Sequence, residues 1–213
     1  MPPPTLAYMA QQRRWLPDDP LALEIISKRI AEGQPATIVQ QQGMGWVDAP
    51  EHLTVLEAAP VDPDPSVPLV IISDRLLGPR PEVDRLVILR PPTLTLGVAS
   101  RRELHDEELN EALRLFCRKA GYSQQSIMAV AASARRRSLA VLDDLADRLK
   151  APLLFYEDHI LNRTPLGQPG KMAGTCAVAA ILAAGVKAVE VDSTPFFGKL
   201  CLALARRPVQ LPK

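Results

Sequence analysis

Apolar residues in the first part of the chain alternate between helical and extended spacing. Between Leu21 and Ile30 they fall on one face of a helix, and Gly33 follows as a helix stop. Short apolar runs typical of strands follow at residues 36–40, 69–73 and 86–89. Four prolines within residues 58–68 predict a loop ahead of the second of these strands.

The second part of the chain alternates more regularly. The pattern predicts helices at residues 106–120, 138–149 and 175–184, a helical turn at 157–162, and strands at 94–99, 152–156, 186–191 and 200–205. The apolar run at 126–133 fits a strand or a helix equally well. Strands that alternate with helices predict an α/β fold, a layered sandwich with a mostly parallel or mixed sheet in two small lobes.

Composition and charge divide the chain at Pro91-Pro92. Residues 1–90 carry 8 Lys+Arg and 12 Asp+Glu, a net charge of −4, whereas residues 91–213 carry 17 and 12, a net charge of +5. We therefore expect four segments: a disordered lead or linker at 1–19, one lobe at 20–90, a second at 91–207, and a tail at 208–213. The excess of basic residues in the second lobe suggests an anionic partner.

Several classes of protein are disfavoured by composition. A net charge of +1 gives no field that would attract nucleic acid. The three cysteines are far apart and the three histidines share no ligand spacing, so we expect neither a disulfide framework nor a metal site. The N-terminus lacks the pattern of a signal peptide, and no apolar stretch is long enough for a membrane span. We expect no membrane partner and a cytoplasmic location.

Candidate ligand contacts gather where predicted strands end. The strand at 94–99, which includes Gly97, is followed by Ser100, Arg101 and Arg102. Ligands bind at such strand ends in open α/β sheets, and the guanidinium fork suits carboxylates. The alternative is a solvated turn whose arginines pair with nearby glutamates. Arg135-Arg136-Arg137 has the same two interpretations, a carboxylate grip or a solvated helix start.

Two further segments carry candidate chemistry. Gly174 and Thr175 precede a small-residue helix whose N-terminal N–H groups would suit an anion, although Thr175 is equally a plain N-cap. Ser133 follows an apolar run, but no Gly-x-Ser-x-Gly motif supports a nucleophile elbow. Glu157-Asp158-His159 follows a strand end and is either an acid–base pair or an acidic helix start. The catalytic residues stay unassigned.

Several short segments of the sequence, taken in their order along the chain, resemble segments of the cobalt-precorrin 5A hydrolases (CbiG) of cobalamin biosynthesis. Residues 20–39 and 70–75 resemble parts of that family's middle region, which makes 20–90 a shortened version of it. Residues 89–102, 132–133, 177–185 and 201–206 resemble its C-terminal domain, as in the stand-alone CobE proteins. The family's N-terminal domain has no counterpart. The resemblance implies contacts to substrate from Gly97, Ser100, Arg101, Arg102, Ser133, Gly174 and Thr175.

The resemblance also implies a reaction: hydrolytic opening of a lactone on a cobalt-bound tetrapyrrole, with release of acetaldehyde. Cobalt would be part of the substrate, a carboxylated corrinoid or precorrin, and no other cofactor is expected. The chain departs from the family at Ser100, where a Cys is usual, and at Val178, where a Glu is usual. These departures keep open an alternative: a non-catalytic module that holds a corrinoid or passes it to a methyltransferase of the same pathway.

Overall fold

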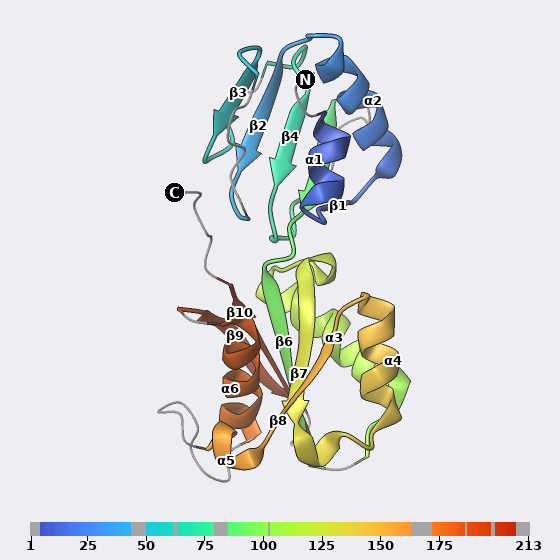
Figure 1. The fold of residues 1–213 in the computed structure, drawn as a ribbon, viewed down its shortest axis with the longest axis vertical. Helices are drawn as coiled ribbons and strands as arrows, with labels where there is room; N and C mark the ends of the chain where they lie inside the picture. The colour runs from blue at the N-terminus through green and yellow to red at the C-terminus, as the bar shows by residue number, and fades with distance from the viewer. Residues whose placement is uncertain are drawn as a thin grey trace. The chain divides into compact units, whose positions relative to one another are not determined.

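The computed structural model describes residues 5–43, 50–61, 64–78, 85–101, 103–162, 172–185, 187–196 and 199–207. The described residues divide into two compact units (Figure 1), the first within Met1–Pro92 and the second within Thr93–Pro208. The change of unit falls directly after the Pro91-Pro92 pair. Each unit contains a five-stranded mixed sheet with helices packed on it, which confirms the α/β class. Independent folding of each lobe stays a prediction.

The sheet of the first unit has the strand order β1-β5-β4-β2-β3. Its strands are β1 (Leu16–Pro17), β2 (Ala36–Gln40), β3 (Leu53–Leu56), β4 (Leu69–Ile72) and β5 (Leu86–Arg90). Strands β3, β2, β4 and β5 are parallel, and β1 adds to β5 in the antiparallel sense. Helices α1 (Leu6–Gln12) and α2 (Pro20–Ala31) contribute to one core cluster with this sheet.

Helix α2 begins and ends on local signals that the sequence displays. The Asp19 carboxylate accepts hydrogen bonds from the N–H groups of Leu21 at 2.9 Å and Ala22 at 3.2 Å, and Pro20 occupies the first turn. After the helix, Gly33 adopts a φ of +79°, which favours glycine. Of the apolar residues predicted on one helix face, Ile26 and Ile30 face the core, whereas Leu21 is 58% exposed and Ile25 is half-buried.

Residues 1–19 were expected to be a disordered lead, and the structure corrects this expectation for residues 5–19, whereas residues 1–4 lie outside the described residues. Thr5 caps α1, and Leu6, Met9 and Ala10 are buried against α2 and the sheet. Their spacing of three and four positions is that of a helix face, but the seven-residue helix is too short for a strong periodic signal. Strand β3 was likewise not predicted, because its outward residues leave little apolar pattern.

The sheet of the second unit has the strand order β8-β7-β6-β10-β9. Its strands are β6 (Leu94–Ser100), β7 (Ile127–Ser133), β8 (Leu153–Tyr156), β9 (Val189–Phe196) and β10 (Leu200–Arg206). Strands β6, β7 and β8 are parallel, whereas β10 is antiparallel to both β6 and β9. The ambiguous run at 126–133 is therefore a strand.

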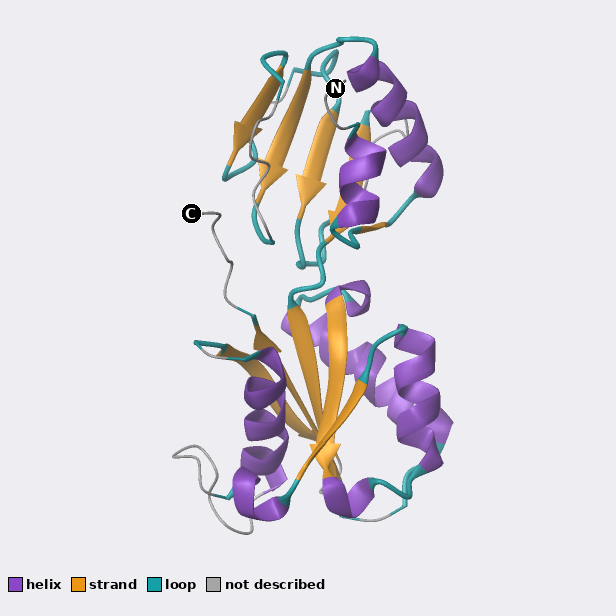
Figure 2. Cartoon of the chain, in the orientation of Figure 1, coloured by secondary structure: helices purple, strands orange, loops and turns teal. Residues whose placement is uncertain are grey.

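Helices cover both faces of this second sheet (Figure 2), which makes a three-layer sandwich. Helices α3 (Asp106–Ala120) and α4 (Ala140–Leu149) lie on one face, and α6 (Met172–Ala184) lies on the other. The short helices are η1 (Gln124–Ser126), η2 (Ala134–Arg136) and α5 (Asp158–Leu161). Among the described residues, every helix is too short or too polar to cross a membrane.

Residue size differs between the two faces of the second sheet. On β10, Leu200, Leu202 and Leu204 join the core under α3 and α4, whereas Cys201, Ala203 and Ala205 join the core under α6. Strand β6 alternates in the same way, with leucine and valine on the α3/α4 face. The face of small residues lets α6 approach the strands closely, as the Ala-rich sequence of this helix indicates.

Candidate functional site

A pocket of about 270 Å³ opens at the carboxyl ends of β6 and β7 in the second unit. Its lining comes from β6, β7, η2, α5 and α6: Val98, Ala99, Ser100, Ser133, Arg135, Arg136, Asp158, Leu161, Asn162 and Thr175. The carboxyl edge of parallel strands is where open α/β sheets bind ligands. This pocket is our candidate functional site.

The polar centre of the pocket is a contact between Ser133, Asp158 and Arg135. The Ser133 hydroxyl donates to Oδ1 of Asp158 at 2.6 Å. The guanidinium of Arg135 pairs with Oδ2 of the same carboxylate through Nε. The side chain of Asp158 is 28% exposed and that of Arg135 is 81% exposed. The carboxylate is thus held from two sides but stays open to the pocket.

Local structure fixes Ser133 and Asp158 in this arrangement. Ser133 ends β7, and its hydroxyl accepts the Arg135 N–H at 3.3 Å, which starts η2. Asp158 is the first residue of α5, directly after β8. Leu161, at the end of that turn, is 1% exposed and packs in a core cluster with Val178 and Ala179 of α6. An apolar anchor therefore holds the turn that presents the carboxylate.

Gly97 lies beneath α6, outside the pocket lining. A Cβ atom at this position would stand 1.9 Å from the carbonyl oxygen of Cys176. Nearby, the Thr95 hydroxyl donates to the Ala180 carbonyl at 2.7 Å. Gly97, predicted as a substrate contact, thus has a packing role: it allows the helix that carries Thr175 to lie close to the strand that carries Ser100.

Of the predicted arginine pair, the structure describes Arg101 alone, and Arg101 is not in the pocket lining. It is exposed, and its backbone N–H donates to the Lys199 carbonyl at 2.9 Å. Arg102 lies outside the described residues, as do Arg163 and Lys171. Among the described residues, the basic side chains that line the pocket are Arg135 and Arg136. Arg136 lines it, half-buried, and its side chain has no hydrogen bond or ion pair with any described residue.

Three other predicted residues, Ser100, Ser133 and Thr175, line the pocket. Ser100, at the end of β6, is 7% exposed and lines it, as does Ser133. Helix α6 begins at Met172, three residues earlier than predicted, so Thr175 lies within the helix and is not its N-cap. Thr175 still lines the pocket, and Gly174 is half-buried beside it.

Asp158 is a candidate residue that the sequence analysis named only within the segment Glu157-Asp158-His159, as an acid–base pair or an acidic helix start. Of these three residues, the structure brings Asp158 into the pocket, and Glu157 and His159 are exposed. Burial raises the pKa of Tyr156, two residues before Asp158. No group of three metal-binding side chains occurs in the described residues.

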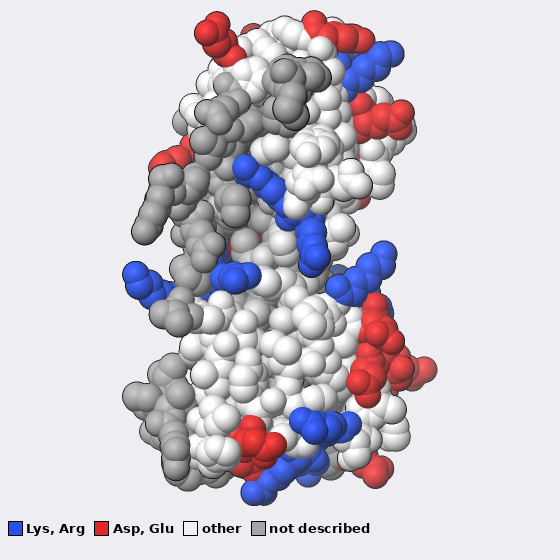
Figure 3. All heavy atoms as spheres, in the orientation of Figure 1, with Lys and Arg blue, Asp and Glu red and all other residues white. Residues whose placement is uncertain are grey.

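In the space-filling view, basic and acidic atoms lie together at the lower end of the second unit (Figure 3), where β6 and β7 end in Figure 1. The face above them is mostly uncharged. Mixed charge at the strand ends suits a ligand that carries carboxylates and also needs a proton acceptor.

The fold and the site together define this protein as an α/β sandwich with a polar pocket at its strand ends. A family model described as "Cobalamin synthesis G C-terminus" matches residues 94–205, which is 112 of the 213 residues and nearly the whole second unit. The chain belongs to this family, and membership assigns it to cobalamin biosynthesis. Residues 20–90 lie outside the match, so their resemblance to the CbiG middle region stays a prediction.

Three solved structures match the chain at low sequence identity. A cobalamin biosynthesis protein G homolog from Sulfolobus solfataricus is 18% identical, with a TM-score of 0.48, and the match covers 96% of this chain and 60% of that one. CobE, a protein from the cobalamin (vitamin B12) biosynthetic pathway, is 23% identical, with a TM-score of 0.48, and the match covers 56% and 94%. Cobalamin biosynthesis protein chiG from Agrobacterium tumefaciens str. C58 is 21% identical, with a TM-score of 0.42 and coverage of 53% and 96%. No curated protein matches the chain.

Proposed function

We propose that this protein opens the lactone of a cobalt-precorrin 5A-like corrinoid by hydrolysis and releases acetaldehyde. Family membership supplies the pathway, and one observation supports the reaction. The Asp158 carboxylate stands in the pocket at the strand ends, 2.6 Å from the Ser133 hydroxyl. The sequence had suggested that the chain lacks the carboxylates such a reaction needs. Asp158 supplies one from a different element.

The proposed chemistry needs one water molecule and a group that accepts its proton. A carboxylate is a suitable general base when its surroundings raise its basicity. Arg135 now partly neutralises Asp158, but this arginine is 81% exposed, so its pairing is weak and screened by solvent. A carboxylate arm of the substrate would compete for Arg135. The bound macrocycle would also exclude water from Asp158, which favours proton uptake.

The size of the pocket limits what enters it. A volume of about 270 Å³ is below the range of roughly 300–1,000 Å³ that encloses a drug-sized ligand. A tetrapyrrole is larger still. We therefore propose that the pocket takes only the lactone-bearing edge of the ring and one carboxylate arm. Arg136, which has no partner among the described residues, is the group that would grip this arm.

The test of catalysis is acetaldehyde release from cobalt-precorrin 5A. We expect Asp158→Asn to lower the rate by a factor on the order of 100 to 10,000, because the proton acceptor is lost. Glu157→Gln is the matched control, since this neighbouring carboxylate is exposed and does not line the pocket. A wild-type rate in Asp158→Asn would contradict the proposed mechanism.

The test of binding is titration of a cobalt-corrin intermediate, followed by its visible absorbance. We expect Arg136→Ala to weaken binding by about tenfold or more, as for loss of a charge-assisted hydrogen bond. Arg101→Ala is the control at an exposed arginine outside the pocket lining. If Arg101→Ala weakened binding and Arg136→Ala did not, the ligand would bind at the Arg101-Arg102 turn predicted from the sequence.

A non-catalytic carrier is the second candidate, and a specific observation favours it. Val178 stands where the family usually carries a Glu, and it is 1% exposed within an apolar cluster. No carboxylate is therefore available at that position, and Ser100 has no thiol. If the wild-type chain binds the corrinoid tightly yet releases no acetaldehyde, it is a carrier that holds the intermediate for a methyltransferase of the pathway.

A further inference from the structure

Two buried thiols meet between α6 and β10. The Sγ atoms of Cys176 and Cys201 are 2.6 Å apart, although 25 residues separate them along the chain. Both side chains are 0% exposed and belong to the core cluster of the α6 face. The two sulfurs are well inside van der Waals contact and close to the ~2.05 Å length of a disulfide bond. The two cysteines are present as thiols and are not joined in a disulfide.

The close approach of the two thiols has an identifiable cause. Cys201 pairs across the sheet with Ala99, next to Gly97 on the same face of β6. The missing Cβ of Gly97 lets the Cys176 carbonyl lie against the strand, because any side chain there would meet that oxygen at 1.9 Å. The helix backbone is thereby held at a depth where the Cys176 side chain reaches β10.

We propose that Cys176 and Cys201 are a disulfide-forming site that covalently ties the start of α6 to β10. The oxidant class is a small-molecule disulfide. One cysteine thiolate attacks a sulfur of the oxidant, releases one small thiol and forms a mixed disulfide; the other cysteine then displaces the second small thiol. The two cysteines lose two protons and two electrons in total, and the oxidant takes up both.

The bond would stiffen one wall of the pocket. Cys176 directly follows Thr175, and Cys201 follows Leu200, which pairs with Ser100; both Thr175 and Ser100 line the pocket. Oxidation therefore fixes the spacing between the helix and the strand that carry these two residues. The site itself does not depend on the proposed hydrolysis, because its formation is measured on the thiols.

Because both thiols are buried, their oxidation is tested during refolding of the chain. Because both sulfurs are inaccessible to solvent, an oxidant reaches them most readily while the chain folds. The full chain is refolded from denaturant with oxidised glutathione, denatured again, labelled with N-ethylmaleimide and weighed by mass spectrometry. We expect one label, with loss of two hydrogens, and three labels after dithiothreitol. Peptide mapping should link Cys176 to Cys201.

Matched variants identify the pair. Cys117 lies in the core on the opposite face of the sheet, so Cys117→Ala should still lose both remaining thiols on oxidation. Cys201→Ala should keep two labels and form no internal bond. The oxidised wild-type chain should also have a higher thermal midpoint than the reduced chain, because the bond restricts the unfolded state. Three labels on the oxidised wild-type chain, or a bond that involves Cys117, would overturn the proposal.

Discussion

Each unit carries an aspartate–arginine pair near the carboxyl end of its parallel strands, and the two pairs differ in burial. In the first unit, Asp18 pairs with Arg90 at the end of β5, and the side chains are 7% and 2% exposed. In the second, Asp158 pairs with Arg135, and they are 28% and 81% exposed. The residue types are the same, but only the second pair is accessible to a ligand.

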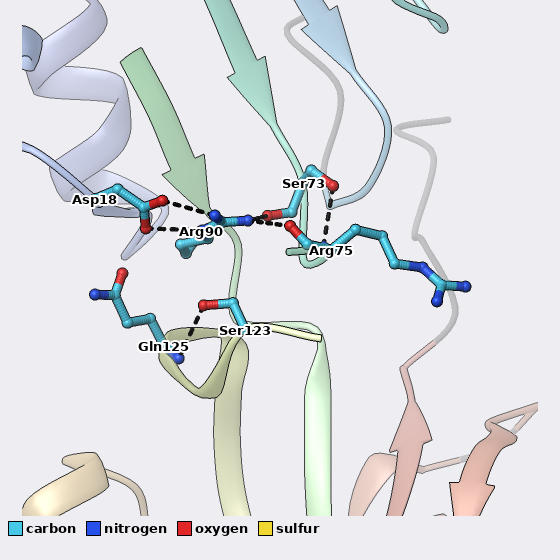
Figure 4. Close-up of polar contacts among 6 residues, drawn as sticks. All are labelled: Asp18, Ser73, Arg75, Arg90, Ser123 and Gln125. Atoms are coloured by element: carbon cyan, nitrogen blue, oxygen red, sulfur yellow. Dashed lines mark hydrogen bonds and ion pairs between the residues drawn. The ribbon is translucent and has the colours of Figure 1, made fainter. Parts of the chain in front are cut away.

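The buried pair is satisfied within the protein (Figure 4). Arg90 donates from Nε to Oδ1 of Asp18 at 2.8 Å and from Nη2 to Oδ2 at 2.6 Å. Its Nη1 donates to the carbonyl oxygens of Ser73, at 3.0 Å, and Arg75. This arginine thus ties the segment before α2 to the ends of β4 and β5. With its donors engaged and its surface covered, it is a structural group.

In the exposed pair, the side chains can still interact with a ligand. Asp158 accepts one hydrogen bond from Ser133, and its salt bridge faces solvent. An exposed pair is held by little free energy, typically ~0–1 kcal/mol, so a ligand can replace one partner at low cost. The comparison teaches that burial, more than residue type, decides whether such a pair holds the fold together or serves a site.

The largest expected effect comes from breaking the buried pair. Asp18→Ala should lower the free energy of unfolding by about 3–5 kcal/mol, because it leaves the Arg90 charge buried without its counterion. Tryptophan fluorescence during urea unfolding follows the first unit, since both tryptophans of the chain lie before Pro92. The double variant Asp18→Ala with Arg90→Ala should cost less than the two single losses added together. Strict additivity would show that the pair is not coupled.

An alkaline transition should be specific to the second unit, which contains all three cysteines. Burial raises the pKa of the Cys117 thiol to about 12. The unfolded thiol ionises from about pH 8.5, so between there and pH 12 the unfolded state binds fewer protons and stability falls as pH rises, by up to ~1.4 kcal/mol per pH unit. Circular dichroism melts of Cys117→Ala should show a shallower decline over that range. Equal slopes in variant and wild type would contradict the assignment.

A substitution that displaces α6, one wall of the pocket, without changing any charge should have an intermediate effect on the free energy of unfolding. Gly97→Ala should lower the free energy of unfolding of the second unit by about 1–3 kcal/mol or more, because the new methyl group meets backbone of α6. Gly78→Ala is the control, since a Cβ there meets nothing within 4 Å. Circular dichroism should detect the loss, while tryptophan fluorescence should keep its wild-type midpoint. A neutral Gly97→Ala would mean that α6 can shift outward freely.

The smallest effect is expected at the exposed pair. Arg135→Ala should change the free energy of unfolding by less than about 1 kcal/mol, because the pair is screened by solvent. Circular dichroism during urea unfolding measures it, with Arg101→Ala as the control at another exposed arginine. A loss as large as that of Asp18→Ala would remove the distinction between a structural and a functional pair.

The sequence by itself determined the elements whose signals are local. Helix α3 was predicted at 106–120 with its residue bounds, because acidic residues start it, apolar residues repeat along it, and Gly121, with a φ of +73°, ends it. The α/β class followed from such signals, whereas the family was suggested by a resemblance of short segments in the same order along the chain.

Only the tertiary structure decided which side chains meet. Ser133 and Asp158 are 25 residues apart, and Asp18 and Arg90 are 72 apart. Neither separation along the chain produces a periodic pattern in the sequence, because strand order and helix placement bring these pairs together. The same holds for Arg101 and Arg136: both follow strand ends, but only Arg136 turns into the pocket lining. Local patterns specify elements, whereas the path of the chain between elements specifies the site.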